Sequence, residues 1–192
     1  MKQIKEAIKQ LITVSEDELN HFLKDSFIKT FKKNEIISFP NLVPNDIFFI
    51  NNGLIRFLLT DIKGVEHTTC FGIENQFIAD YSNFILQKPT IITIQALEET
   101  EIVITPRTSI EWGYQNMQYG DRLGRLIAEY YYIFQDETIK NSYTRTPTER
   151  YNSITSFFPN IHNRVPQKMI ASYLGISPVH LSRLKKSENL KR

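Results

Sequence analysis

The chain has 192 residues, of which 41% are hydrophobic, and its formal net charge is +2. This length allows one large or two small domains, and the apolar content suffices for a hydrophobic core. Cys70 is the only cysteine, which excludes disulfide frameworks, zinc knuckles and cysteine-ligated iron–sulfur clusters within one chain. No apolar run approaches the roughly 20 residues of a membrane span, and the N-terminus lacks a signal peptide's apolar stretch, so we expect a cytoplasmic protein without a membrane partner.

The first 29 residues have a helical pattern. Ser15-Glu16-Asp17-Glu18 fits a capping box, which marks the start of a helix. Four apolar residues follow on one helix face: Leu19, Phe22, Leu23 and Phe27. The sequence therefore predicts helices up to about Thr30.

From about Thr30 the pattern changes to short β-rich runs separated by turns. The candidate strands are residues 36–39, 47–50, 54–60, 65–71, 91–97 and 102–105. Asn51-Asn52-Gly53 and residues 61–64 predict hairpins, because Asn and Gly accept the left-handed turn conformation, and residues 98–100 predict a third turn. Many short strands at this spacing predict an all-β roll or barrel of roughly 75 residues.

A long helical pattern occupies about residues 109–140, and two adjacent apolar seams run along it. The first seam, at heptad steps of four and three, is Tyr119, Leu123, Leu126, Tyr130 and Ile133, and the second is Ile127, Tyr131 and Phe134. We expect one seam to pack on the roll and the other to meet the same helix of a second subunit. A single broad stripe facing the core is the alternative. Gly120 and Gly124 each cost about 1 kcal/mol relative to Ala, and they would permit close approach of another backbone.

The segment after the long helix predicts a domain boundary. Thr146-Pro147-Thr148-Glu149 combines an N-cap, a Pro favoured at the first helical position and the acidic residue of a capping box. A short helix through Phe158 follows. Residues 141–146 are polar and without period, so we expect a hinge there. The predicted domains are residues 1–140, with the N-terminal helices, the roll and the dimerisation helix, and residues 141–192.

Residues 167–186 have the pattern of a helix-turn-helix that reads DNA. The apolar positions that pack two crossed helices together are Ile170, Leu174, Ile176, Leu181 and Leu184. Ala171 is small where the second helix crosses, and Gly175 tolerates the positive φ that the turn needs. Ser177 is a good N-cap and Pro178 is favoured at the first helical position, so the second helix has a defined start.

The distribution of charge also favours a nucleic-acid partner at this end. Residues 163–192 carry seven cations and one acid, a net charge of +6, which leaves −4 for residues 1–162. Such asymmetry is typical of a nucleic-acid-binding end on a neutral or acidic body. The second helix would expose donors for phosphates and base edges: His180, Ser182, Arg183, Lys185 and Lys186. An ordinary helical hairpin with a solvated basic face, or a basic disordered tail, is the alternative.

The order of helices, β-roll, long helix, hinge and helix-turn-helix resembles the Crp/Fnr superfamily of transcription regulators. The segments that carry the resemblance are KKNE at 32–35, IFFINNGLIR at 47–56, QALEETE at 95–101 and IASYLGIS at 170–177. The resemblance covers nearly the whole chain. It implies an α+β fold, with an N-terminal double-stranded β-roll (cupin-like, cyclic-nucleotide-binding-domain-like), a long dimerisation helix and a C-terminal helix-turn-helix domain. It also implies a homodimer on double-stranded DNA, with RNA polymerase as a further partner.

The chain departs from this family where cyclic nucleotides bind. Members that bind them carry a Gly-Glu pair and an Arg that pairs with the cyclic phosphate, whereas Ala79-Asp80 and Thr90 occupy these positions here. A buried phosphate without a cation loses its charge-assisted, bidentate partner, so we predict no tight binding of cAMP or cGMP. An unknown small-molecule effector would instead contact Phe71, Phe77, Asp80, Tyr81, Thr90 and Ile92.

Other modes of sensing in the superfamily are not supported by the sequence. His67 and Cys70 lie on a predicted strand at odd spacing, so we expect their side chains on opposite faces rather than around a haem. We predict no cofactor, no metal site and no catalytic residues, and hence no enzyme. Only residues 187–192 follow the recognition helix, so we also expect no β-hairpin wing of the kind the family usually has.

By resemblance, Pro178, Val179 and Arg183 occupy the base-facing positions. Arg183 would bind a guanine bidentately, which is worth about 1–3 kcal/mol of discrimination, while the two apolar residues could contact a thymine methyl. The side chains expected toward phosphates are Ser177, His180 and Lys186, with Lys185 nearby. A module of the same fold that binds an effector or a protein, with weak or lost DNA binding, is the alternative function.

Overall fold

The computed structural model describes residues 1–189 of the chain, and for residues 187–189 the backbone alone. The helices are α1 (Lys2–Leu11), α2 (Glu16–Phe22), α3 (Tyr81–Leu86), α4 (Arg107–Asn116), α5 (Gly120–Thr144), α6 (Pro147–Phe157), α7 (Ile161–Arg164), α8 (Gln167–Tyr173) and α9 (Pro178–Asn189). The strands are β1 (Phe27–Phe31), β2 (Ile36–Ser38), β3 (Asp46–Asn52), β4 (Ile55–Thr60), β5 (Glu66–Gly72), β6 (Phe77–Ile78), β7 (Ile92–Ala96) and β8 (Thr100–Pro106). Within the described residues, no helix is both long and apolar enough to cross a membrane.

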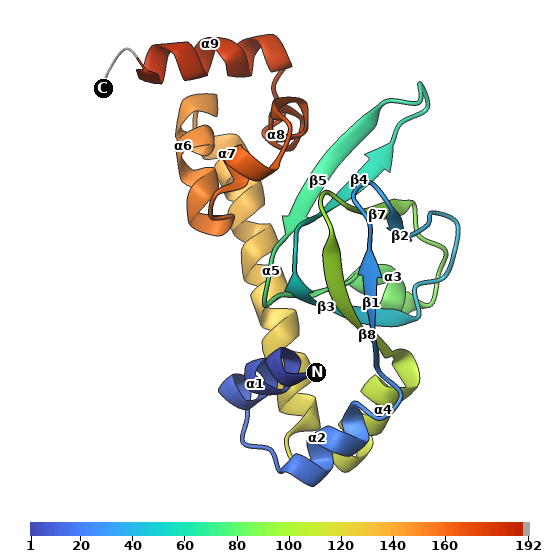
Figure 1. Ribbon diagram of the computed structural model, residues 1–192. Helices are drawn as coiled ribbons and strands as arrows, with labels where there is room; N and C mark the ends of the chain where they lie inside the picture. The colour runs from blue at the N-terminus through green and yellow to red at the C-terminus, as the bar shows by residue number, and fades with distance from the viewer. Residues whose placement is uncertain (190–192) are drawn as a thin grey trace.

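The eight strands form the predicted β-roll from two four-stranded antiparallel sheets. One sheet has the order β1-β8-β3-β6 and the other β2-β7-β4-β5, so the chain changes sheet after nearly every strand. The side chains buried between the sheets are Phe31, Phe48, Ile50, Ile55, Phe57, Ile78, Ile94, Ala96, Ile102 and Ile104. Figure 1 shows α5 running along this roll, from α1 and α2 at one end to α6–α9 at the other. The predicted α+β fold is confirmed.

Of the two predicted hairpins, one is confirmed and one is wrong. Residues 61–64 join β4 to β5, which pair antiparallel, and Gly64 has a φ of 78°. Asn51-Asn52-Gly53 instead ends β3 and begins the crossing to β4, which belongs to the other sheet. Gly53 has a φ of 105°, and a Cβ atom there would lie 2.5 Å from the Thr100 hydroxyl oxygen. Glycine therefore allows the crossing between the sheets to pass against the start of β8.

The N-terminal region differs from its prediction at one end. The capping box of Ser15 is confirmed, since its hydroxyl accepts the Glu18 N–H and the Glu18 carboxylate accepts the Ser15 N–H. Phe27, however, begins β1 rather than extending the helical face, because α2 ends at Phe22 and the chain then turns. The sequence pattern also misses β6 and α3, since elements of two and six residues are too short to show a period.

The predicted helix of about residues 109–140 is divided into α4 and α5, with residues 117–119 between them. The predicted close approach of another backbone occurs at Gly120, within the chain, whereas Gly124 faces a side chain. A Cβ at Gly120 would lie 2.0 Å from the Gly113 carbonyl oxygen, and one at Gly124 would lie 2.5 Å from the Tyr114 ring. The predicted hinge at 141–146 is wrong for residues 141–144, which continue α5 as helix.

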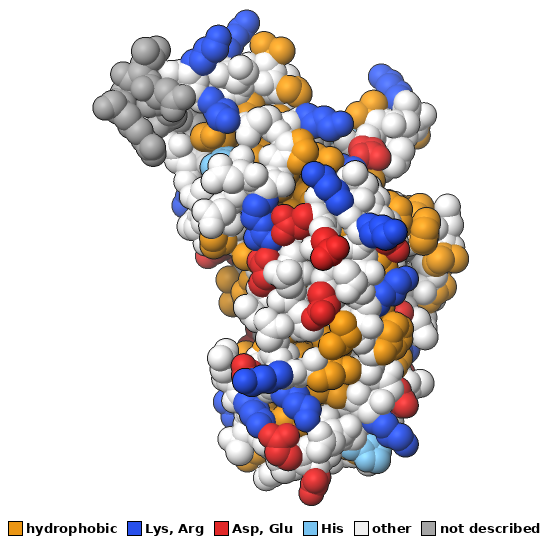
Figure 2. All heavy atoms as spheres, in the orientation of Figure 1, with side chains coloured by type: hydrophobic (Ala, Val, Ile, Leu, Met, Phe, Trp, Pro, Cys, Tyr) orange, Lys and Arg blue, Asp and Glu red, His pale blue; other side chains and the backbone are white. Residues whose placement is uncertain are grey.

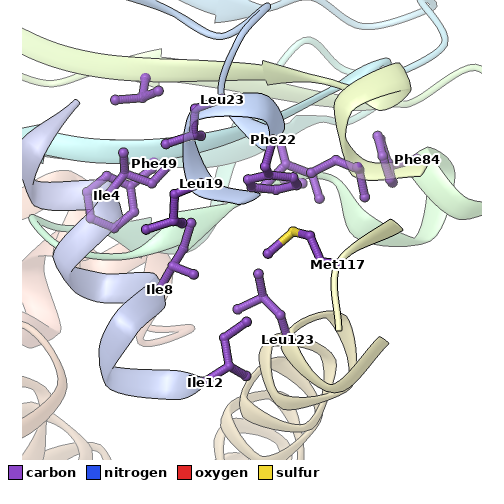
Figure 3. Close-up of a cluster of buried hydrophobic side chains, with 14 residues drawn as sticks. Ile4, Ile8, Ile12, Leu19, Phe22, Leu23, Phe49, Phe84, Met117 and Leu123 are labelled. Atoms are coloured by element: carbon purple, nitrogen blue, oxygen red, sulfur yellow. The ribbon is translucent and has the colours of Figure 1, made fainter. Parts of the chain in front are cut away.

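The two N-terminal helices pack against one end of the roll and against α5. Ile4 and Ile8 of α1, Leu19 of α2 and Leu123 of α5 belong to one buried cluster, which also includes Phe49 of β3. Figure 3 shows these side chains in one cluster between α1, α2, α5 and the roll. This packing anchors the start of α5. It therefore fixes the direction in which α5 leads toward the helices α6–α9, which we call the C-terminal unit.

Candidate nucleic-acid interface

α8 and α9 form the predicted helix-turn-helix. The chain leaves α8 through Gly175, which has a φ of 67°, and the N–H groups of Gly175 and Ile176 make the two hydrogen bonds of a Schellman motif, each 3.0 Å long. Ser177 then caps α9, because its hydroxyl oxygen accepts the His180 N–H at 3.1 Å. The predicted turn, cap and helix start are therefore confirmed.

α9 buries one side and exposes the other. Leu181 is 1% exposed and packs in an apolar cluster with Ile170, Ala171 and Leu174. Of the predicted DNA contacts, seven are exposed: Ser177, Pro178, Val179, His180, Ser182, Arg183 and Lys186. Lys185 is partly buried. Most of the predicted contact residues therefore lie on an accessible surface of α9, which we call the outward side.

The cations of the outward side are also unpaired among the described side chains. Arg183, Lys185 and Lys186 form no ion pair with any side chain that the structure describes. Burial, and then the charge of Lys185, lower the pKa of His162 below its usual value. Lys191 and Arg192, which contribute to the predicted charge of this end, lie outside the described residues. Figure 2 shows Lys and Arg side chains around α9 and acidic side chains gathered over the roll.

The other side of the helix-turn-helix packs on the β-roll, which the sequence does not predict. Ser172 of α8 accepts the Thr68 N–H of β5 with its hydroxyl oxygen at 2.9 Å. The Phe71 ring of β5 meets Phe158 edge-on, with 5.7 Å between the ring centroids, and it also contacts Tyr173. One apolar cluster contains Leu54, Phe71 and Leu97 of the roll together with buried residues of the C-terminal helices. We call this the roll-facing side.

A triad of charges adds to this contact. Arg164 of α7 donates to Glu74 at 2.6 Å and to Glu98 at 2.5 Å, and both carboxylates belong to turns of the roll. Burial alone would raise the pKa of Glu74, but hydrogen bonds from Arg164 and from backbone N–H groups bring it below its usual value. The triad joins the two predicted domains through partly exposed side chains.

Arg150 of α6 ties the C-terminal unit to α5. Its guanidinium donates to the Ser142 carbonyl at 2.8 Å and to the Leu174 carbonyl at 3.1 Å. Thr146 caps α6 with the predicted capping box, in which Glu149 is the acidic partner. Only residues 145 and 146 separate α5 from α6, so the junction is short and hydrogen-bonded.

Both predicted seams of α5 contact the rest of the chain, the second at all three of its residues. In the second seam, the Tyr131 hydroxyl donates to the Phe77 carbonyl, and the Phe134 ring contacts Phe158. Ile127 packs with the cluster under α1 and α2, as do Leu123 and Leu126 of the first seam. The large hydrophobic side chains left exposed on α5 are Tyr130 (54%), Tyr132 (73%), Ile133 (56%), Ile139 (57%) and Tyr143 (86%). Tyr119 is the N-cap of α5, outside the helix.

The six residues predicted to contact an effector do not surround one cavity. Phe71 is buried among the C-terminal helices. Phe77 and Tyr81 line a small cavity beside α4 and α5, and Asp80 lines a separate one. Thr90 is buried, and its hydroxyl oxygen accepts the Ile92 N–H at 2.8 Å.

The remaining candidate ligands are also apart. His67 pairs with Asp61 at 3.0 Å, whereas Cys70 donates its thiol proton to the Phe71 carbonyl, and burial raises the Cys70 pKa to about 12. A register shift in the β4–β5 pairing removes the strict alternation that the predicted opposite faces assumed. No group of three or more possible metal ligands occurs within the described part of the chain.

The chain therefore combines a β-roll, a long helix and a helix-turn-helix. Solved structures with this architecture match the chain, although no family model and no curated protein does. FixK2 from Bradyrhizobium japonicum has a TM-score of 0.72 at 14% identity, over 86% of this chain and 85% of that one. A transcriptional regulator assigned to the Crp/Fnr family from Eubacterium rectale gives 0.71 at 14%, over 93% and 85%. The c-di-GMP responsive global regulator CLP from Xanthomonas campestris gives 0.69 at 11%, over 92% and 93%.

These similarities establish the fold. The chain has the fold of the Crp/Fnr regulators, from the N-terminal helices to the helix-turn-helix. The resemblance found in the sequence is therefore confirmed at the level of structure.

Proposed function

We propose that this protein is a sequence-specific DNA-binding transcription regulator rather than an enzyme. The outward side of α9 carries the proposal, because a correctly capped recognition helix presents exposed donors and cations that have no acidic partner among the described side chains. One of the proteins that share the fold, CLP, is a global regulator. RNA polymerase would be a further partner of a regulator bound at a promoter.

Within this surface, we assign sequence readout to three residues. Arg183 is exposed, and its guanidinium has the geometry for bidentate binding to guanine. Pro178 and Val179 are also exposed and would contact a thymine methyl. We assign Ser177, His180 and Lys186 to phosphate contacts, with Lys185 nearby.

We propose a homodimer joined through α5. Tyr130 and Ile133 of the first seam are more than half exposed. A second copy of α5 would cover them, as in a coiled coil. Ile133→Glu should dissociate the dimer in analytical ultracentrifugation, while Gln135→Lys, at an exposed polar position of the same helix away from the seam, should not. A monomeric wild type would contradict the proposal.

We further propose that the effector is not cAMP. Asp80 is acidic and Thr90 is neutral, so neither residue supplies the cation that a cyclic phosphate needs, and both already hold contacts within the fold, Asp80 as the N-cap of α3 and Thr90 with Ile92. Addition of cAMP should leave both DNA affinity and melting temperature unchanged.

The test of DNA binding is selection of bound fragments from random DNA by the purified dimer. An enriched motif with two half-sites about 34–36 Å apart is expected. If the dimer neutralises about eight phosphates, log K should fall against log salt with a slope near −7. Absence of any enriched sequence at moderate salt would favour the alternative, a module of this fold that binds an effector or a protein.

A further inference from the structure

A cavity of about 310 Å³ opens between the two sheets, at the edge formed by β1, β2 and the start of β3. Four phenylalanines line it: Phe27, Phe31, Phe39 and Phe48. The segment between β2 and β3 forms one wall, and the Asn41 N–H holds it to the Thr90 carbonyl at 2.7 Å. Of α5, which is described in full, no residue lines the cavity, and Figure 1 shows β2 and α3 on the side of the roll away from α5.

Asp46, the first residue of β3, brings a carboxylate to this cavity without a partner. Its side chain is partly buried and makes no hydrogen bond or ion pair with any residue that the structure describes. Burial raises the pKa of Asp46 above its usual value. A carboxylate that has lost water and gained no donor is unfavourable, so a ligand that supplies a donor would stabilise it.

The other charged groups of the lining are differently placed. Asp80 is 6% exposed, and its carboxylate already accepts hydrogen bonds from Ser82 and Asn83. Lys29 is exposed, and its ammonium lies 4.4 Å from the centroid of the Phe31 ring. Two carboxylates and one ammonium give the lining a formal charge of −1. The net negative charge of the lining therefore disfavours an anionic ligand. Asp46 is the carboxylate of the lining that is available to bind a ligand.

We propose that this cavity binds a small organic cation, an ammonium group on a short apolar body. The ammonium donates to the Asp46 carboxylate in a charge-assisted hydrogen bond, which is stronger than one between neutral groups. The phenylalanine rings receive the apolar body, and their faces attract positive charge. The volume lies at the lower end of the roughly 300–1,000 Å³ range of ligand pockets, which restricts the ligand to a small one.

Three matched probes test this assignment by isothermal titration calorimetry near pH 7, with the full chain and without DNA. They are 2-phenylethylamine, its neutral analogue 2-phenylethanol and the anion 3-phenylpropanoate. The amine should bind at least tenfold more tightly than the alcohol, and the anion should bind more weakly than either. No binding of the amine, or equal affinity for amine and alcohol, would overturn the proposal.

Three substitutions test whether these probes bind in this cavity. Asp46→Asn should lower the affinity for the amine at least tenfold and leave that for the alcohol unchanged, while Asp25→Asn, an exposed carboxylate outside the cavity, should change neither. Val43→Phe adds a ring to the cavity wall and should weaken both ligands together. Unchanged amine binding in Asp46→Asn or in Val43→Phe would contradict the site. Because no DNA is present, failure here is separate from failure of the proposed regulator function.

Discussion

The roll-facing and outward sides of the C-terminal unit contrast in their contacts. On the roll-facing side, the rings of Phe158 and Tyr173 contact Phe71 of the roll. Arg164 there is paired with two carboxylates. On the outward side, Arg183 and Lys186 are exposed and unpaired among the described side chains. The difference indicates a division of roles. Substitutions on the roll-facing side should change the free energy of unfolding, and those on the outward side should change DNA affinity.

The largest expected effect is that of Phe158→Ala. Phe158 is 1% exposed, and its removal leaves a cavity, so the free energy of unfolding should fall by about 3–5 kcal/mol in urea denaturation. Phe31→Ala, at 2% exposed inside the roll, is the matched control. Hydrogen exchange should then show α6–α9 opening before the roll in Phe158→Ala and the roll opening first in Phe31→Ala. The same order of opening in both variants would contradict the comparison.

On the outward side, Arg183→Ala should reduce discrimination between the selected site and random DNA by about 1–3 kcal/mol. Lys186→Ala should weaken binding to all sequences alike and lower the salt slope by about 1. Competition binding at two or more salt concentrations measures both effects, and neither variant should shift the urea midpoint. Equal loss on specific and random DNA for Arg183→Ala would remove it from the base-reading positions.

Arg164→Ala tests the charged part of the roll-facing side. Since Arg164 and its partners remain partly exposed, we expect a loss of about 1 kcal/mol near pH 7. The pKa of Glu74 is lowered from 4.5 in the folded protein, so its stabilisation is complete above that value and is lost as the pH falls through the lowered pKa. The stability difference between wild type and variant should therefore shrink in urea denaturation below about pH 4.5.

The matched control is Lys168→Ala, an exposed cation of α8. It should leave stability unchanged at both pH values. A difference between wild type and Arg164→Ala that stays constant on acidification would show that the triad contributes through packing rather than charge.

The smallest expected effect is that of removing the Ser177 cap at the start of α9. Ser177→Ala removes the cap of α9 and should lower stability by about 0.5–1 kcal/mol in thermal unfolding. Ser177→Asn should restore it, because Asn caps equally well. Ser182→Ala, at an exposed position in the same helix, should not destabilise, since Ala has the higher helix propensity. A loss in Ser182→Ala equal to that in Ser177→Ala would contradict the role of the cap.

Features that depend on neighbours in sequence were predictable. The capping boxes at Ser15 and Thr146 and the turn at Gly175 are all confirmed, because each joins groups only a few positions apart. The same local reasoning misjudged residues 141–144, whose polar sequence continues α5 as helix. An exposed helix tolerates such residues when pairs like Asp136 and Lys140 lie one turn apart.

Features that depend on distant residues were not predictable. Asn51-Asn52-Gly53 signals a reversal of the chain, but not that β4 leaves the sheet of β3. Arg164 meets Glu74 and Glu98 across 90 and 66 positions, and no spacing in the sequence marks that pairing. The candidate DNA contacts lie together because they belong to one short helix and its cap. The six effector candidates were scattered because they come from separate elements.

The short junction between α5 and α6 leaves the C-terminal helices little freedom to rotate or shift relative to α5. In a dimer joined along α5, the recognition helices are held at a fixed phase, because two residues and the Arg150 hydrogen bonds separate the dimer helix from the C-terminal unit. One residue inserted into the helix would turn everything beyond it by about 100°. Operators with stretched or compressed half-site spacing should therefore be rejected abruptly, rather than tolerated by degrees as a flexible tether would allow.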